Sequence, residues 1–76
     1  MYKLQSILLS RQFFKLNDAV NWLEANKFKV KKLDATQNYW RFRQNEPSAL
    51  RKEGFTTFRT KEVAPNVKFI FSYKDD

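Results

Sequence analysis

Hydrophobic residues recur along this chain with two periods, one typical of a helix and one typical of strands. The helical period occurs in a single segment. Apolar side chains recur at the i, i+3, i+4 and i+7 spacing that forms one stripe on a helix, at Leu16, Ala19, Val20 and Leu23. Asn17 is a residue type that caps helices, because its side chain accepts a bond from a free amide of the first turn. The pattern predicts a short amphipathic helix over about residues 18–26.

Elsewhere the hydrophobic pattern has the period of two that is typical of strands. We expect strands at residues 5–9, from Phe28 to about Lys31, and at residues 39–44, 56–63 and 67–73. The segment 39–44 is the clearest of these and is expected to be central in the sheet. Pro65 and Asn66 mark a turn between the last two strands, and residues 45–54 have the composition of a loop.

This order of elements, β-α-β-β-β-β, predicts an α+β fold with two layers. One amphipathic helix covers one face of a mainly antiparallel sheet of four or five strands. The chain has 76 residues, which is enough for one small domain, and we assign residues 1–76 to it.

Composition makes this a basic but foldable chain. Lys and Arg number 15 against 8 Asp and Glu, so the formal net charge is +7, and aromatic residues make up 17% of the sequence. The many large rings supply a core that a disordered basic tail would lack. His and Cys are absent and there is one Gly, which excludes imidazole bases, thiolate nucleophiles, disulfides, the usual zinc sites and glycine-rich phosphate loops.

The remaining candidates for catalysis are acids that the pattern scatters over separate elements. They are Asp18, Glu24, Asp34, Glu46, Glu53 and Glu62, and Asp75 and Asp76 are expected to form a frayed end. Paired carboxylates or a metal site would require acids on one face. We therefore expect no enzymatic activity, no cofactor and no metal.

Basic residues alternate with aromatic residues on the predicted strands, and this is the strongest functional feature of the sequence. With the helix over Trp40, Phe42, Phe58, Phe28 and Val30, the opposite face would be an open positive platform. Its expected residues are Tyr39, Arg41, Arg43, Arg59, Lys61, Lys29 and Lys31. Cations that neutralise phosphates beside rings that stack on bases suit single-stranded DNA or RNA without strong sequence preference. The alternative is an ordinary solvated face whose charges protect the sheet from aggregation.

Two further features complete the set of candidate contacts. Arg51 and Lys52 lie in the predicted loop, where they could grip a phosphate backbone, and Tyr73 is a second ring for stacking. The last strand is apolar on both sides, with Ile70 opposite the stripe formed by Val67, Phe69, Phe71 and Tyr73. That strand is then either central or covered by a partner, which leaves open a protein-interaction module that docks on an acidic protein or self-associates.

Several short motifs resemble a small, uncharacterised domain family of bacteriophage and large DNA virus proteins. They are Ile7-Leu8-Leu9, Ala19-x-x-Trp22-Leu23, Phe28-Lys29-Val30-x-Lys32 and Thr36-x-Asn38-Tyr39-Trp40-Arg41-Phe42-Arg43-Gln44, followed by a late basic strand Phe58-Arg59-Thr60-Lys61 and a final strand Val67-Lys68-Phe69-Ile70. The resemblance implies a viral accessory protein and carries over no catalytic residue. We single out Arg41, Arg43 and Gln44 as solvent-facing from their alternation. Relatives usually have Gly at the helix end, where this chain has Lys27, so we expect the helix to close with Asn26 or by another geometry.

The first residues lack the charged and apolar regions of a signal peptide, and no apolar run approaches the length of about 20 residues that a membrane helix needs. These features predict a protein of the host cytoplasm or the virion that does not contact a membrane.

Overall fold

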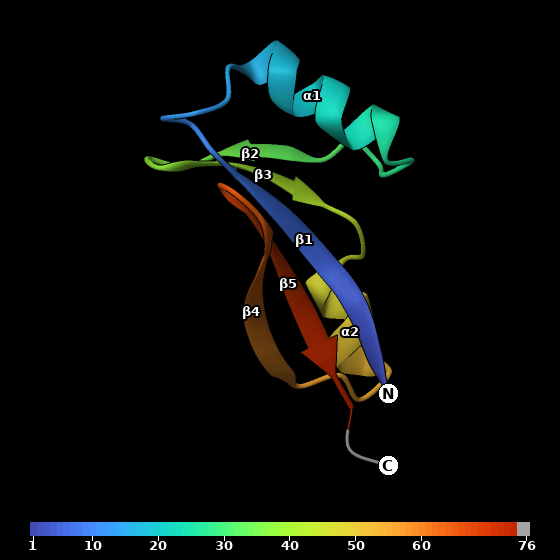
Figure 1. The fold of residues 1–76 in the computed structure, drawn as a ribbon. Coiled ribbons are helices and arrows are strands. Elements are labelled where there is room, and N and C mark those ends of the chain that lie inside the picture. Colours follow the sequence, from blue (N-terminus) through green and yellow to red (C-terminus); the bar gives the residue numbers. More distant parts are fainter. Residues whose placement is uncertain (75–76) are drawn as a thin grey trace.

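The computed structural model describes residues 1–74 as one five-stranded antiparallel sheet with a helix on each face (Figure 1). Asp75 and Asp76, which we expected to be frayed, lie outside the described residues. The elements are β1 (Tyr2–Ser10), α1 (Leu16–Ala25), β2 (Leu33–Ala35), β3 (Tyr39–Arg43), α2 (Pro47–Lys52), β4 (Thr57–Ala64) and β5 (Val67–Tyr73). Their order in the sheet is β2-β3-β1-β5-β4. The predicted small α+β fold is confirmed.

The central strand is β1, which pairs with β3 on one edge and β5 on the other. The segment 39–44 was expected at the centre, but it forms β3, one position away from it. Strand β5 is also internal, because β1 and β4 occupy its two edges. This position explains why its sequence is apolar on both sides, and it excludes backbone pairing of β5 with another chain.

The prediction of a strand from Phe28 to Lys31 is wrong. Residues 28–32 form an irregular connection, and β2 begins only at Leu33. The alternation of Phe28 and Val30 with lysines reflects a segment that lies flat against the protein, because both apolar side chains pack against the core.

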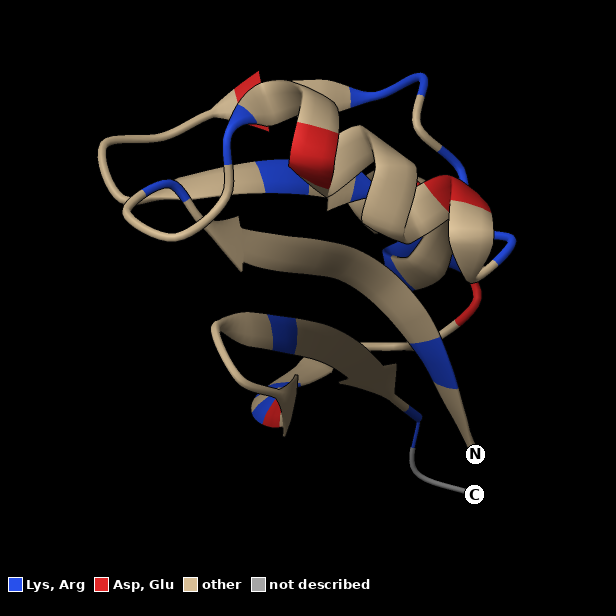
Figure 2. Ribbon diagram, turned by 45° about the horizontal axis from the view of Figure 1, so that its top comes forward, with Lys and Arg blue, Asp and Glu red and all other residues tan. Residues whose placement is uncertain are grey.

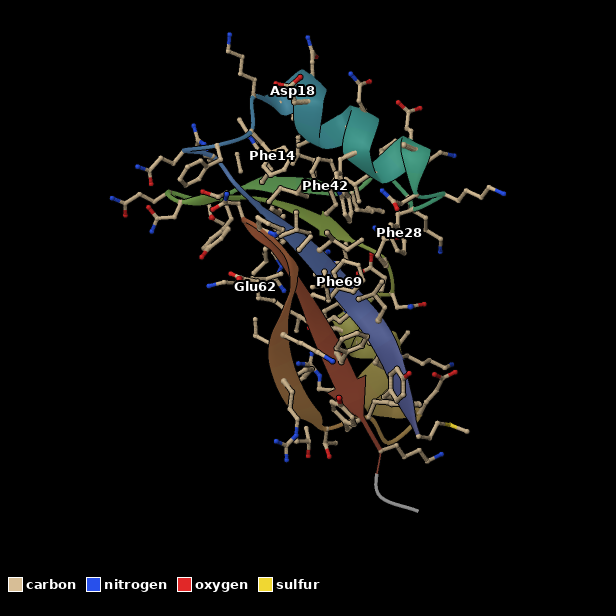
Figure 3. All side chains as sticks on the ribbon, in the orientation of Figure 1. Phe14, Asp18, Phe28, Phe42, Glu62 and Phe69 are labelled. Carbon is tan, nitrogen blue, oxygen red and sulfur yellow. The ribbon has the colours of Figure 1, made fainter. Side chains whose placement is uncertain are left out.

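Helix α1 covers β2, β3 and β1 and forms the main core with them (Figures 1 and 3). Its buried residues are Ala19 and Leu23, which pack in one cluster with Ile7, Leu9, Phe42 and Val67. The helix begins at Leu16 rather than at residue 18, its N-cap is Lys15 without a side-chain bond, and Leu16 is 37% exposed. The predicted Asn17 cap is therefore wrong, because that residue already lies inside the first turn.

A second helix, α2, occupies the predicted loop 45–54. Pro47 stands in its first turn and Gly54, with φ of 94°, follows its end, which is the usual placement of both residue types around a helix. Leu50 and, just beyond the helix, Phe55 are both 2% exposed. They cover the face of the sheet opposite α1, where Ser6 and Ser72 are fully buried and Lys3 lies over the Phe55 ring. The loop prediction failed because Pro47 and Gly54 were interpreted as loop residues instead of helix boundaries.

Helix α1 ends at a residue with a left-handed backbone. Lys27 has φ of 64°, its N–H donates to the Glu24 carbonyl at 3.1 Å, and the N–H of Phe28 donates to the Leu23 carbonyl at 2.9 Å. These two bonds are the pattern of a Schellman motif, in which Gly usually holds the left-handed position. Lys27 adopts it although its Cβ makes this conformation unfavourable.

We expect Lys27→Gly to raise the free energy of unfolding by about 0.5 to 1 kcal/mol, because Gly adopts positive φ without a steric cost. Urea denaturation followed by circular dichroism measures the change. Lys27→Ala is the matched control, since it removes the ammonium group but keeps the Cβ. An equal gain in both variants would mean that the lysine charge, and not the backbone, is responsible.

Candidate nucleic-acid interface

Strand register determines which cations share a face, because residues directly opposite each other in a sheet point to the same side. Lys61 lies opposite Phe69 and Arg59 opposite Phe71. Phe69 in turn lies opposite the core residue Ile7, so Arg59 and Lys61 are on the α1 side of the sheet.

The other predicted pair of cations points to the opposite side. Arg41 lies opposite Leu8, and Leu8 lies opposite Lys68, all on the face away from α1. Phe58, which we expected under the helix, is also on that face and is 45% exposed. The prediction that one platform carries all the strand cations is therefore wrong.

The face away from α1 carries cations with acidic neighbours. The Arg43 guanidinium pairs with Asp34 at 3.2 Å and with Glu46 at 3.3 Å. Lys68 lies opposite Glu62 in the sheet. Since each acid cancels part of the potential of its neighbour, the charges of Arg43 and Lys68 are partly offset.

Tyr39 is also engaged on that face. Its hydroxyl accepts a 3.1 Å hydrogen bond from the Lys68 Nζ, which also lies 5.5 Å from the centre of the Tyr39 ring. This hydrogen bond, followed by the charge of a Tyr39 phenolate and then that of Glu62, raises the pKa of Lys68, while partial burial opposes the shift. A ring covered by a lysine in this way is a poor stacking platform for a base.

The α1 side has an uncovered area beside the helix, over β4, β5 and the start of β1 (Figure 1). We call this area the aromatic face and define it by Tyr2, Phe71, Tyr73, Arg59 and Lys61. Tyr2 is 62% exposed, and its ring lies 5.3 Å from that of Phe71 and 5.7 Å from that of Tyr73. The Arg59 guanidinium lies 5.8 Å from the centre of the Tyr73 ring. Rings and cations are thus interleaved here.

A chain of ring contacts leads from the aromatic face to the end of α1. Phe71 contacts Phe69 with ring centres 5.9 Å apart, and Phe69 contacts Phe28 at 5.5 Å. Phe28 stacks on Trp22 of α1 at 6.2 Å, with ring planes 12° apart. Figure 3 shows Phe28 below the end of the helix and Phe69 farther along the sheet.

Lys29 and Lys31 lie in the connection between α1 and β2, where Figure 2 shows a concentration of basic residues. Gln44 holds this connection in place. Its Oε1 accepts from the Lys29 N–H and its Nε2 donates to the Lys29 carbonyl, both at 2.9 Å. The Lys29 Nζ returns a 3.2 Å bond to the Gln44 carbonyl. Gln44 is only 8% exposed, so our expectation that it faces solvent is wrong.

An open groove of about 840 Å³ lies beside this connection. Its walls come from the end of α1, residues 27–32, the end of β3 and the start of α2, and its cations are Lys27, Lys29, Lys31, Lys32 and Arg43. Glu24 and Glu46 also line it. The structure therefore brings Lys29 and Lys31 together with two lysines that the sequence analysis did not select.

Arg51 and Lys52 are exposed in the last turn of α2, on a helix that caps the face opposite α1. They belong to neither the aromatic face nor the groove lining. Tyr2, Lys27 and Lys32 are the candidate contacts that sequence reasoning missed. Their signal was available in Tyr2, which alternates with the apolar Leu4 at the start of β1, and in the run of lysines that surrounds Phe28.

No family model, curated protein or solved structure matches this chain. Among residues 1–74, no cluster of acids could hold a metal ion, and neither helix has the length and apolar character required to cross a membrane. The viral resemblance stays a prediction.

We expect Gln44→Ala to lower the free energy of unfolding by about 2 to 3 kcal/mol, because it leaves the partly buried Lys29 N–H and carbonyl without their partner. Urea denaturation measures the loss, and hydrogen exchange of the Lys29 amide locates it. Asn45→Ala, which removes a single 2.7 Å bond to the Leu4 carbonyl from an exposed residue, is the control. Unchanged protection of the Lys29 amide in Gln44→Ala would contradict this role.

We expect Tyr39→Phe to lower the pKa of Lys68, because it removes the hydrogen bond that raises that pKa. The stability that this bond contributes is complete below the ordinary lysine pKa and is lost as the pH rises through the raised pKa. An NMR titration of the Lys68 side chain measures the change. Glu62→Gln is the comparison and is expected to lower the pKa less. An unaltered titration in Tyr39→Phe would show that the bond is not formed in solution.

Proposed function

We propose that this domain binds single-stranded nucleic acid, without strong sequence preference, through the aromatic face. The observation that carries the proposal is the register of the β4–β5 hairpin, which sets Arg59 and Lys61 opposite Phe71 and Phe69. Cations and rings then lie at the spacing of adjacent strands on a surface that α1 leaves open.

The chemistry of this surface suits a strand whose bases are unstacked. Base–aromatic stacking contributes about 1 to 3 kcal/mol per base and tolerates any sequence, because every base has a π face. Tyr2 is the most exposed of these rings. In duplex DNA the bases are stacked on one another, so the rings would be left without partners.

The position of Arg59 and Lys61 on an edge strand supports contact with phosphates. All of β4 except Ala64 is exposed, so both cationic side chains reach solvent beside the rings. Neutralising phosphates releases counterions, and the affinity then falls with salt with a log–log slope of about −0.7 per phosphate on a single strand. With the viral resemblance, the proposal is that of a viral accessory module acting on DNA or RNA.

A protein-interaction module is the second candidate, and the outer edge of β4 favours it. This strand of eight residues pairs only with β5 among the described residues, and an exposed edge can accept a strand from another chain. Association through this edge would use backbone bonds and would persist in high salt, whereas binding through Arg59 and Lys61 would not.

The test is fluorescence anisotropy with labelled single-stranded DNA, single-stranded RNA and duplex DNA between about 50 and 200 mM salt, where phosphate-driven binding weakens strongly. We expect the double variant Arg59→Gln, Lys61→Gln to reduce the magnitude of the salt slope by about 1.4, which corresponds to two phosphate contacts. Tyr2→Leu is expected to weaken binding about tenfold with an unchanged slope, because it removes a stacking ring and no charge.

The matched control is Lys15→Gln, Arg51→Gln, which removes the same charge from the N-cap of α1 and from α2. It is expected to alter the slope far less than the β4 variant. Equal effects of the two double variants would mean that binding depends on the net charge of the protein and not on the aromatic face. A larger effect of Arg41→Gln, Lys68→Gln would show that the ligand binds to the opposite face of the sheet. Absence of binding at the lower salt would reject the proposal in favour of the protein-interaction module.

A further inference from the structure

We propose that the groove beside Phe28 is a separate binding site for a nucleoside phosphate, taken either as a free nucleotide or as the phosphate-bearing end of a strand. The groove is formed by segments that are distant in sequence, which the Gln44–Lys29 bonds hold together. It thus exists as a formed surface before any ligand binds. Its volume of about 840 Å³ falls in the range of small-molecule sites, about 300 to 1,000 Å³.

The polar groups at the groove show which ligand charge it accepts. The amide of Gln44 is bound to the Lys29 peptide, and the amide of Asn45 donates to the Leu4 carbonyl. Glu46 is paired with Arg43. The groups left for a ligand are mainly the ammonium groups of Lys27, Lys31 and Lys32, which are exposed and can only donate. Glu24 is the one acid that lines the groove outside these pairs.

Donors without matching acceptors select an anion, and lysines bind phosphate as point charges. Three lysines gathered on a segment of six residues hold a phosphate better than one isolated lysine would. Figure 2 shows these basic residues along the connection between α1 and β2, with few acids among them. The acids that line the groove come from α1 and from the residue before α2.

The apolar lining shows that the ligand is larger than inorganic phosphate. Phe28 and Val30 line the groove from the connection between α1 and β2, and Ala49 lines it from α2. An aromatic or apolar body beside the phosphate would cover these side chains, and a nucleoside supplies one. A binding site for phosphate alone would need no such surface.

Phe28 also relates the groove to the aromatic face. It lines the groove and contacts Phe69, whose ring is the neighbour of Phe71. A strand stacked on the aromatic face would therefore have the groove at one end of its path. The groove proposal does not require this strand, because a free nucleotide satisfies the same contacts.

The test uses ¹⁵N-labelled wild-type protein, with AMP, adenosine and inorganic phosphate as separate probes in NMR titrations. We expect AMP to shift the amide signals of residues 27–32 and the indole signal of Trp22, which stacks on Phe28. Adenosine and inorganic phosphate are each expected to bind at least fivefold more weakly than AMP. Equal binding of AMP and adenosine, or shifts that lie outside the groove, would overturn the proposal.

Two variants test the groove by different physical means. Lys31→Gln, Lys32→Gln removes two donors and is expected to weaken AMP binding at least fivefold, whereas the matched control Lys15→Gln, Arg51→Gln leaves it within twofold. Ala49→Leu fills the groove without a change of charge and is expected to weaken AMP binding as well. Unchanged AMP affinity in both groove variants, with their folds intact by circular dichroism, would reject the site.

The source of the nucleotide is identified with oligonucleotides that carry a 5′-phosphate, a 3′-phosphate or no terminal phosphate. Tighter binding of one phosphorylated end, lost in Lys31→Gln, Lys32→Gln, assigns the groove to a strand end. AMP binding without any effect of a terminal phosphate assigns it to free nucleotides. Loss of oligonucleotide binding in Arg59→Gln, Lys61→Gln with AMP binding retained shows that the aromatic face and the groove are separate sites.

Discussion

The paired hydrogen bonds between the Gln44 amide and the Lys29 peptide hold together the part of the molecule on which the groove depends. They join the end of β3 to the irregular segment 28–32, which is not itself a strand. The backbone of Gln44 in turn donates to the Gln5 carbonyl at 2.7 Å, where the pairing of β1 with β5 shifts its register. The buried Gln44 side chain and the backbone bond from the Arg43 N–H to the Lys32 carbonyl, at 2.9 Å, therefore fix residues 28–32 against the sheet.

This arrangement has a direct consequence for the lysines. Because the backbone of Lys29 is held inward, Phe28 and Val30 pack against the core while Lys31 and Lys32 remain exposed. The turn at Lys27 contributes to the same result, since its left-handed backbone reverses the chain and brings Phe28 under the helix end. The contacts that stabilise residues 27–32 are thus the same ones that leave the lysine side chains exposed to solvent.

Much of the fold could be predicted from local pattern, and the exceptions have identifiable causes. The stripe of Ala19 and Leu23 reports burial directly, and the alternation in β5 reports an extended strand, so helix and strand were predicted there. Residues 28–32 have the sequence pattern of a strand because apolar and polar side chains also alternate in an irregular segment that is held flat against the sheet. Helix α2 was missed because Pro47 and Gly54 have the same composition signal at a helix boundary as in a loop.

The site was harder to predict because alternation within one strand does not show which side of the sheet a residue faces. That side is determined by how the strand pairs with its neighbours. Within β4 the alternation correctly groups Arg59 with Lys61, but Phe58 suggested that its own side was the buried one. The hairpin reverses that assignment by setting Arg59 opposite Phe71. If β5 had been predicted as an internal strand, its ring stripe would have continued the core through Phe69. The cations of β4 would then have been predicted on the same face as these rings.

The different partners of the cations on the two faces of the sheet support the role proposed for the aromatic face. On the face away from α1, Arg43 has Asp34 and Glu46 as partners, so its charge is largely cancelled. Arg59 lies beside a ring instead, and ring contact leaves a cation its full charge while it orders the side chain. Part of the net charge of +7 thus lies beside the rings of the aromatic face, and part lies on the lysines that surround Phe28. The exposed Tyr2 ring lies beside the Tyr73 ring that Arg59 contacts, which distinguishes this surface from two other cation–ring contacts of the protein. In those contacts Lys68 is hydrogen-bonded to Tyr39 and Lys3 is paired with Glu53.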